Sequence, residues 1–151
     1  MSHYSHAPRV AGVFSAMQVA ASGLTAQRGR MNIIASNLAN ARTTKGADGN
    51  PYRRMDPVFT AEQVKPGSFD PVLRNVYEVK LTSVKPDTQP GQLVYDPGHP
   101  DANPEGYIEY PNVNVVTEMV NLMTASRAYE AGVTSIESVK SMALAALKIG
   151  Q

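Results

Sequence analysis

Apolar residues recur every seven positions near both ends of the chain, a spacing typical of long helices that pack against other helices. Between Val10 and Asn40 the repeat consists of Met17, Leu24, Met31 and Leu38. Between Val115 and Ile149 one repeat consists of Leu122, Tyr129, Ile136 and Ala143, and an interleaved one of Met119, Ser126, Val133, Lys140 and Leu147. We therefore predict two long helices. Either Asn112 or Asn114 would cap the start of the second helix, and Gly150 would suit its end.

A further apolar row on the second helix lies off the main repeat: Val116, Val120, Met123, Val139, Met142 and Ile149. A single partner helix cannot cover both rows, so the width of the apolar surface indicates contact with more than one helix. Glycines at positions 12, 23 and 29 weaken the first helix when it stands alone. We expect the two ends to be frayed in the free subunit and to fold when they dock.

The middle of the chain has a different character, because ten of the eleven prolines lie between residues 51 and 111. Short strands are predicted at Val76–Val84, Gln92–Tyr95 and Gly106–Tyr110. Seven of the chain's ten aromatic residues lie in this region, which suggests that it has a small core of its own. The predicted fold class is mainly α with a small β insert. The long N- and C-terminal helices would pair as a coiled-coil-like hairpin, with short β-strands and Pro-rich loops between them.

These patterns divide the chain into four parts. Residues 1–9 form a flexible N-terminus, and residues 10–44 the N-terminal helix. Residues 45–112 form the β-rich, Pro-rich insert, and residues 113–151 the C-terminal helix.

Charge is distributed unevenly, although the net charge is only +1. The first 47 residues contain five basic side chains and no acid, whereas residues 48–112 contain ten acids and six bases. The basic N-terminal stretch resembles a transit peptide in composition, but we prefer to interpret it as a helix that docks against something acidic. No apolar run is long enough to span a bilayer, and no secretory signal is present, so membrane insertion is not expected. The absence of cysteine excludes disulfides, thiol catalysis and cysteine-bound zinc.

The sequence offers little that could carry catalysis. It contains no GxSxG, GxxxxGK[ST] or GxGxxG motif. The loop that includes Asp101, Asn103 and Glu105 imitates the opening of a calcium site, but Asn112 occupies the position of the essential carboxylate and Pro104 stiffens the loop. A rigid turn explains this loop better, and we expect no bound metal and no cofactor. An enzyme that uses Asp96, His99, Asp101 and Glu105 is the weakest hypothesis.

A nucleic-acid partner is also not expected. Arg28, Arg30, Arg42, Lys45, Arg53 and Arg54 could neutralise phosphates. However, no aromatic residue lies between Met17 and Pro51 to stack on bases, and no short recognition helix follows a tight turn.

Three segments carry a resemblance to a known family: SNLANARTTKG near one end, NPYRR at Asn50–Arg54, and YDPGHPDANPEGYIEYPNVNVVTEMVNLMTASRAYEA at Tyr95–Ala131. With these, the chain resembles the bacterial flagellar axial proteins of the rod and hook, and the Asn50–Arg54 stretch fits the proximal-rod branch best. Arg42 departs from the wider pattern, in which asparagine is common at that position.

The resemblance implies a non-enzymatic structural subunit of the flagellar basal-body rod, which polymerises helically through its terminal helices and transmits torque across the envelope in motility. It implies export by the flagellar type III apparatus, without a cleaved signal peptide, to a periplasmic rod. Expected partners are copies of the chain, other rod proteins, and export-gate or MS-ring adaptor proteins at the rod base. The alternative is a non-enzymatic helical adaptor that forms a small closed oligomer.

The resemblance also marks the residues expected to serve assembly: Asn32, Asn37, Leu38, Asn40, Tyr52, Arg53, Arg54, Asn112, Asn114, Glu118, Met119, Asn121, Leu122, Met123, Arg127 and Tyr129. Asparagine is a poor residue for a helix interior, because its side chain competes for backbone hydrogen bonds. By the resemblance, Asn37 and Asn40 belong to the signature that links the first helix to the next segment, and we expect their amides to contact neighbouring subunits. The competing interpretation is a local cap of the helix end by Asn40 alone.

Overall fold

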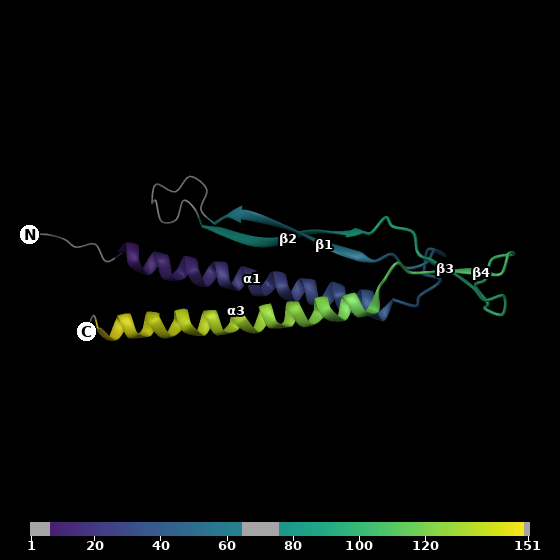
Figure 1. The fold of residues 1–151 in the computed structure, drawn as a ribbon. Helices are drawn as coiled ribbons and strands as arrows, with labels where there is room; N and C mark the ends of the chain where they lie inside the picture. The colour runs from purple at the N-terminus through teal and green to yellow at the C-terminus, as the bar shows by residue number, and fades with distance from the viewer. Residues whose placement is uncertain (1–6, 65–75, 150–151) are drawn as a thin grey trace, which may run out of the picture. The chain divides into compact units, whose positions relative to one another are not determined.

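The computed structural model describes residues 7–64 and 76–149, and within these ranges it contains two long helices and four strands. The elements are α1 (Ala7–Ala39), β1 (Met55–Gln63), β2 (Tyr77–Pro86), β3 (Gln92–Tyr95), β4 (Tyr107–Tyr110) and α3 (Val115–Ile149) (Figure 1). Strand β1 pairs with β2, and β3 pairs with β4, in two separate sheets. The prediction of a mainly α fold with a small β insert is therefore confirmed.

Most elements lie close to their predicted places. Helix α3 covers the predicted stretch, and α1 begins earlier than predicted, at Ala7. Strands β2, β3 and β4 overlap the three predicted strands. Strand β1 was missed, because Pro57 argues against a strand when it is read in the sequence. In a sheet of only two strands each strand is an edge, and an edge position tolerates proline.

The chain divides into two compact units. The first contains the described parts of residues 1–28, 59–82 and 126–151, and the second contains residues 29–58 and 83–125.

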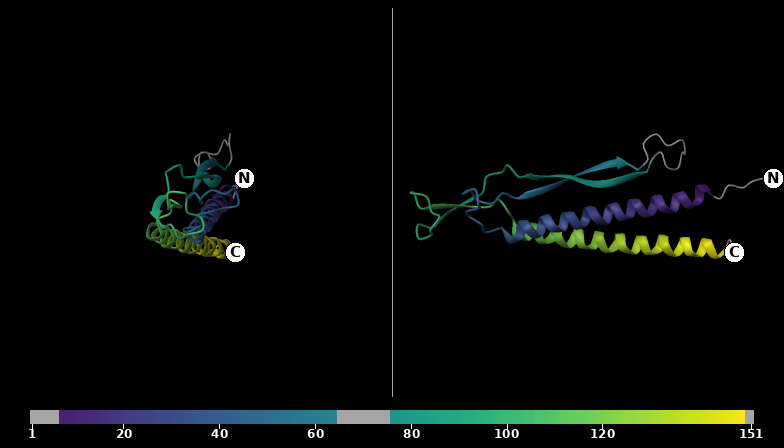
Figure 2. Two further views of the ribbon diagram at one scale, coloured as in Figure 1. Left: turned by 90° about the vertical axis from the view of Figure 1, so that its right-hand side faces the viewer. Right: turned by 180° about the vertical axis from the view of Figure 1, so that it is seen from behind.

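In the first unit, the N-terminal part of α1 lies between the β1–β2 strands and the C-terminal part of α3, which runs antiparallel to it (Figures 1 and 2). The N–H of Val79 in β2 donates to Ser22 Oγ of α1 at 3.1 Å. A Cβ atom at Gly132 of α3 would lie only 2.7 Å from Leu24 Cδ2 of α1. Glycine at position 132 therefore lets the two helices approach closely.

In the second unit, β3 and β4 form an antiparallel hairpin in which Tyr95 pairs with Tyr107 and Leu93 with Glu109. The buried side chains of this unit are few, and two of them are polar. They are Ile34, Asn37, Ile108, Pro111, Glu118 and Ala125.

Burial along the helices follows two of the three repeats seen in the sequence, whereas Met119, Val133 and Lys140 of the interleaved repeat are exposed. The first-helix repeat and the Leu122 repeat are half-buried throughout, whereas Val116, Val120, Met123 and Met142 of the additional row are exposed. The expected separate core of the β insert is largely wrong. The apolar side chains of β2 are exposed, and among the described strand residues only Ile108 is fully buried.

Candidate functional site

The side chain of Asn37 lies near the end of α1 and is 1% exposed. Its Nδ2 donates to the carbonyl of Met55 at 2.9 Å and to Glu118 Oε2 at 3.3 Å. Its Oδ1 accepts from the Tyr52 hydroxyl and from the Met55 N–H, both at 2.9 Å. An amide has two donors and room for two acceptor bonds, so every hydrogen-bonding position of Asn37 is used within the chain. The amide of Asn37 therefore serves the inside of the second unit, and its expected contact with a neighbouring subunit stays a prediction.

Asn40 acts locally at the helix end. Its Nδ2 donates to the carbonyl of Ser36 at 2.9 Å, and its Oδ1 accepts from Thr43 Oγ1 at 3.2 Å. Beyond Ala39 the backbone tightens to an i→i−3 bond from Ala41 N–H to the Leu38 carbonyl. These contacts satisfy groups that any helix end leaves unpaired, as the competing interpretation of a local cap requires.

A buried ion pair adjoins the Asn37 amide. Glu118 of α3 is 1% exposed, and its Oε1 accepts from Arg54 Nε at 2.8 Å. Arg54 also pairs with Asp56, and its Nη1 lies 4.0 Å from Asp87 Oδ2. Partial burial alone would lower the pKa of Arg54, but its hydrogen bond to Glu118 and the charges of Glu118 and Asp56 raise it. The guanidinium is therefore held in its charged form, as a buried carboxylate requires.

Two asparagines position the chain around this ion pair. Asn112 Oδ1 accepts from the Arg54 N–H at 2.9 Å, which joins the segment before α3 to the segment before β1. Asn114 Oδ1 accepts from the Thr117 N–H at 3.0 Å. Asn114 is therefore the N-cap of α3, which decides between the two predicted candidates.

Arg53, next to Arg54 in the sequence, reaches the β3–β4 hairpin. Its Nη1 donates to the Gln89 carbonyl at 2.8 Å, and its Nη2 lies 3.3 Å from Glu109 Oε1. Tyr52, Arg53 and Arg54 of the NPYRR segment therefore all make their side-chain contacts within the second unit. We name the side chains of Asn37, Tyr52, Arg54, Asn112 and Glu118 the asparagine–arginine network.

The other predicted residues lie outside this network. Leu38, Asn121, Leu122 and Tyr129 are half-buried, and Asn32, Met119, Met123 and Arg127 are exposed. Sequence reasoning missed Met55, whose backbone makes two bonds to Asn37, and the acidic partners Asp56 and Asp87. Alternation along β1 would have placed Asp56 beside Arg54, but that strand was not predicted.

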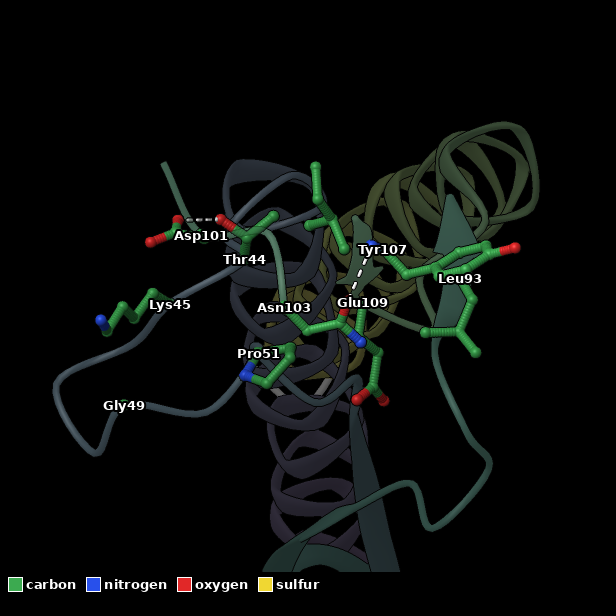
Figure 3. Close-up of a pocket in the computed structure, with 10 residues that line it drawn as sticks. Thr44, Lys45, Gly49, Pro51, Leu93, Asp101, Asn103, Tyr107 and Glu109 are labelled. Carbon is green, nitrogen blue, oxygen red and sulfur yellow. Dashed lines mark hydrogen bonds between the residues drawn. The ribbon is translucent and has the colours of Figure 1, made fainter. Parts of the chain in front are cut away.

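A shallow pocket of about 300 Å³ lies in the second unit, between the turn after α1 and the β3–β4 hairpin (Figure 3). Thr44 Oγ1 donates to Asp101 Oδ2 at 2.7 Å across its rim. Asn103 Oδ1 accepts from the N–H groups of Glu105 and Tyr107, at 3.0 and 2.8 Å. The side-chain oxygens of Asp101 and Asn103, which resemble calcium ligands in the sequence, thus accept hydrogen bonds that hold the loop in place. Among the described residues, no cluster of three His, Cys, Asp or Glu side chains could hold a metal ion.

Comparisons with known proteins show the family to which the chain belongs. Residues 17–47 match the family model described as "Flagella basal body rod protein". Residues 105–149 match the model described as "Flagellar basal body rod FlgEFG protein C-terminal". These two matches, one at each helical end, show that the chain is of the class of flagellar basal-body rod proteins.

Relatives named flagellar basal-body rod protein FlgC are similar over most of the chain. The Borreliella burgdorferi protein is 43% identical over 150 residues, covering 93% of this chain and 99% of the relative. The Escherichia coli O6:H1 protein is 47% identical over 133 residues, covering 88% and 94%. The Bacillus subtilis protein is 41% identical over 150 residues, covering 91% and 98%.

The chain therefore belongs to the FlgC family, and it is a structural subunit of the flagellar basal-body rod and not an enzyme. In the part of the chain that the structure describes, no helix combines the length and apolarity needed to cross a membrane.

Proposed function

We propose that the chain builds the rod by helical stacking of subunits through its two long helices, and that it transmits torque across the cell envelope in this way. The supporting observation is an imbalance in burial. Among the described residues five apolar side chains are buried, namely Ala26, Ile34, Ile108, Pro111 and Ala125, whereas seventeen large apolar side chains are exposed. A monomer rarely leaves so much apolar surface in water, and neighbouring subunits would remove it.

One part of this surface is well defined. Val116, Met119, Val120 and Met123 follow one another at helical spacing on α3, and each is more than half exposed. At 100° per residue they share one face, and the buried side chains of Glu118 and Ala125 occupy the opposite face. We name these four residues the α3 strip. We assign to it the contact with a helix of a neighbouring subunit, and we propose coiled-coil-like pairing between α1 and α3 inside each subunit.

The same proposal places the chain in the periplasmic rod after export by the flagellar type III apparatus. Its partners would be copies of itself, other rod proteins, and export-gate or MS-ring adaptor proteins at the rod base. The assembly roles of Met119 and Met123 follow from the α3 strip. For Asn32, Arg127 and Tyr129, an assembly role rests on family resemblance alone.

The test replaces the chain, in the bacterium that encodes it, by variants with a charge in the α3 strip. Val120→Glu and Met123→Glu would each bury a carboxylate in the contact between subunits, so we expect basal bodies without a completed rod and loss of swimming. Thr117→Glu is the matched control, because position 117 is exposed on the same helix but lies outside the strip. Variants of the strip that assemble and swim like the control would contradict the proposal.

A further inference from the structure

The β3–β4 hairpin has one exposed apolar face. Cross-strand pairing and alternation place Leu93, Tyr95 and Tyr107 on this face together with Glu109, and Ile108 on the other. The three apolar side chains are 66%, 64% and 42% exposed, whereas Ile108 is buried. The rings of Tyr95 and Tyr107 meet edge to face with centroids 5.2 Å apart, and Tyr107 reaches toward Leu93 (Figure 3). We name Leu93, Tyr95 and Tyr107 the hairpin face.

The loop that joins the two strands is acidic, although Lys45 lines the pocket beside Leu93 and Tyr107, and Arg53 pairs with Glu109 on the hairpin face. Residues 96–106 contain Asp96, Asp101 and Glu105 and no lysine or arginine. Asp96 uses one oxygen to accept from the Gly98 N–H at 3.2 Å. Among the described residues, the carboxylate of Glu105 forms no ion pair. A partner of this face therefore needs a basic group beside a surface on which aromatic rings can lie.

The second unit itself carries such a surface on α1. Asn32, Ala35 and Ala39 are exposed and lie at helical spacing, and exposed Arg42 follows in the turn after the helix. In the described part of the chain, Arg42 forms no ion pair. The small side chains leave room for rings, and an arginine next to tyrosines gains from both charge attraction and cation–π contact. We name Asn32, Ala35, Ala39 and Arg42 the α1 stripe.

We infer that the hairpin face of one copy docks on the α1 stripe of a second copy, with Arg42 pairing with the acidic loop. This inference rests on the proposed function. The two surfaces differ, so the contact is heterologous, and a heterologous contact that does not close into a ring generates an open-ended helical assembly. It also assigns a partner to the basic, acid-free N-terminal stretch seen in the sequence.

The chain has no cysteine, so single cysteines report this contact without background. One copy would carry Ala39→Cys and a differently tagged copy Leu93→Cys, both expressed in the bacterium that encodes the chain. We expect mild oxidation of isolated basal bodies to join the two tags in a disulfide-linked dimer. Gln92→Cys replaces Leu93→Cys in the control, because Gln92 is exposed on the opposite face of the same strand.

A disulfide-linked dimer between Ala39→Cys and Leu93→Cys, with none between Ala39→Cys and Gln92→Cys, supports the inference. Equal dimer yields from the two pairs overturn it, and so does the absence of a dimer from both. A photo-crosslinking residue at position 93 that joins a different rod protein also overturns it, because the occupant would not be a second copy. Absence of the unsubstituted chain from basal bodies would instead refute the proposed function. Its presence there, without the cysteine dimer, refutes this inference alone.

Charge reversal provides an independent measurement. Arg42→Glu should lower the number of completed rods by about fivefold, the effect of about 1 kcal/mol at one exposed charge pair. Adding Glu105→Arg to the same chain should restore most of that loss. A double variant as defective as Arg42→Glu alone would overturn the pairing of Arg42 with the loop.

Discussion

The side-chain amide of Asn37 in α1 donates a hydrogen bond of 3.3 Å to Glu118 in α3, although 81 residues separate the two in the sequence. Both side chains are fully buried, and each has further partners in the second unit. The asparagine signature of this chain therefore holds a single subunit together, and it determines how the two helices meet β1 inside that unit.

Replacing Asn37 should destabilise the second unit strongly. Asn37→Ala leaves Met55 N–H and one Glu118 oxygen without a partner, so we expect a loss of about 2–4 kcal/mol in the free energy of unfolding. Asn37→Asp should be at least as harmful, because it places a second carboxylate beside Glu118. Urea unfolding of the purified variants, followed by circular dichroism, measures both.

Asn32→Ala is the matched control for Asn37, since Asn32 is exposed on the same helix. Alanine is the better helix former, so the control should unfold within about 0.5 kcal/mol of the wild-type chain. An Asn37→Ala variant as stable as this control would show that the network contributes nothing.

Arg54 and Glu118 should show strong energetic coupling. Removing one partner leaves a charge uncompensated, so we expect Glu118→Gln and Arg54→Met each to cost about 3 kcal/mol. The double variant Arg54→Met with Glu118→Leu should cost clearly less than the sum of the single changes, since no unpaired charge remains. A double-mutant cycle built on unfolding free energies checks this, and additive losses would contradict it.

Hydrogen exchange in the free subunit should differ between the two units. The described part of the first unit buries only the side chains of Ser15 and Ala26, whereas the second contains the asparagine–arginine network. We therefore expect slow exchange around Asn37 and Glu118, and fast exchange in α3 beyond Ser126. Equal protection of both parts in a dilute monomer would contradict the proposal that the helix ends fold on docking.

The carboxyl group of Glu78 should titrate below its ordinary value of 4.5, because a hydrogen bond from Gln18 and the contact with Lys80 lower its pKa. A lowered pKa means that this contact stabilises the folded chain above the unfolded-state pKa, and that the contribution is lost as pH falls through the folded-state pKa. Gln18→Ala should move the pKa back toward 4.5, as measured by NMR titration of the carboxyl carbon. An unchanged titration would show that Gln18 is not the cause.

Gly106 should not tolerate alanine. Its φ of +83° is in the left-handed region, and a Cβ atom there would lie 2.8 Å from Tyr95 Cε2. We expect Gly106→Ala to cost about 1–3 kcal/mol and to disturb the Tyr95–Tyr107 ring contact, which near-UV circular dichroism reports. At Gly98 a Cβ atom would meet nothing closer than 3.5 Å, so Gly98→Ala is the control. Equal losses from the two changes would contradict this explanation.

Local patterns predicted the two helices and strands β2 to β4, because each depends on the spacing and turn chemistry of neighbouring residues. On α3 the Leu122 repeat is half-buried throughout, but Met119, Val133 and Lys140 of the interleaved repeat are exposed, so spacing alone did not separate half-buried from exposed positions. Strand β1 could not be predicted in this way. Its proline is acceptable only because its sheet has two strands, and pairing between distant segments decides that.

By itself the sequence determined the helix repeats, the rigid acidic loop, the absence of thiol chemistry, and the motifs by which the chain resembles the rod proteins. Those features depend on residue type and on short-range order. Only the tertiary structure decided that Asn37 is used inside the subunit, that Asn114 rather than Asn112 caps α3, and that Asp56 and Asp87 join the ion pairs of Arg54. The physical reason is that a polar side chain has several possible partners, and which of them it binds depends on which distant segments the fold brings within about 3 Å of it.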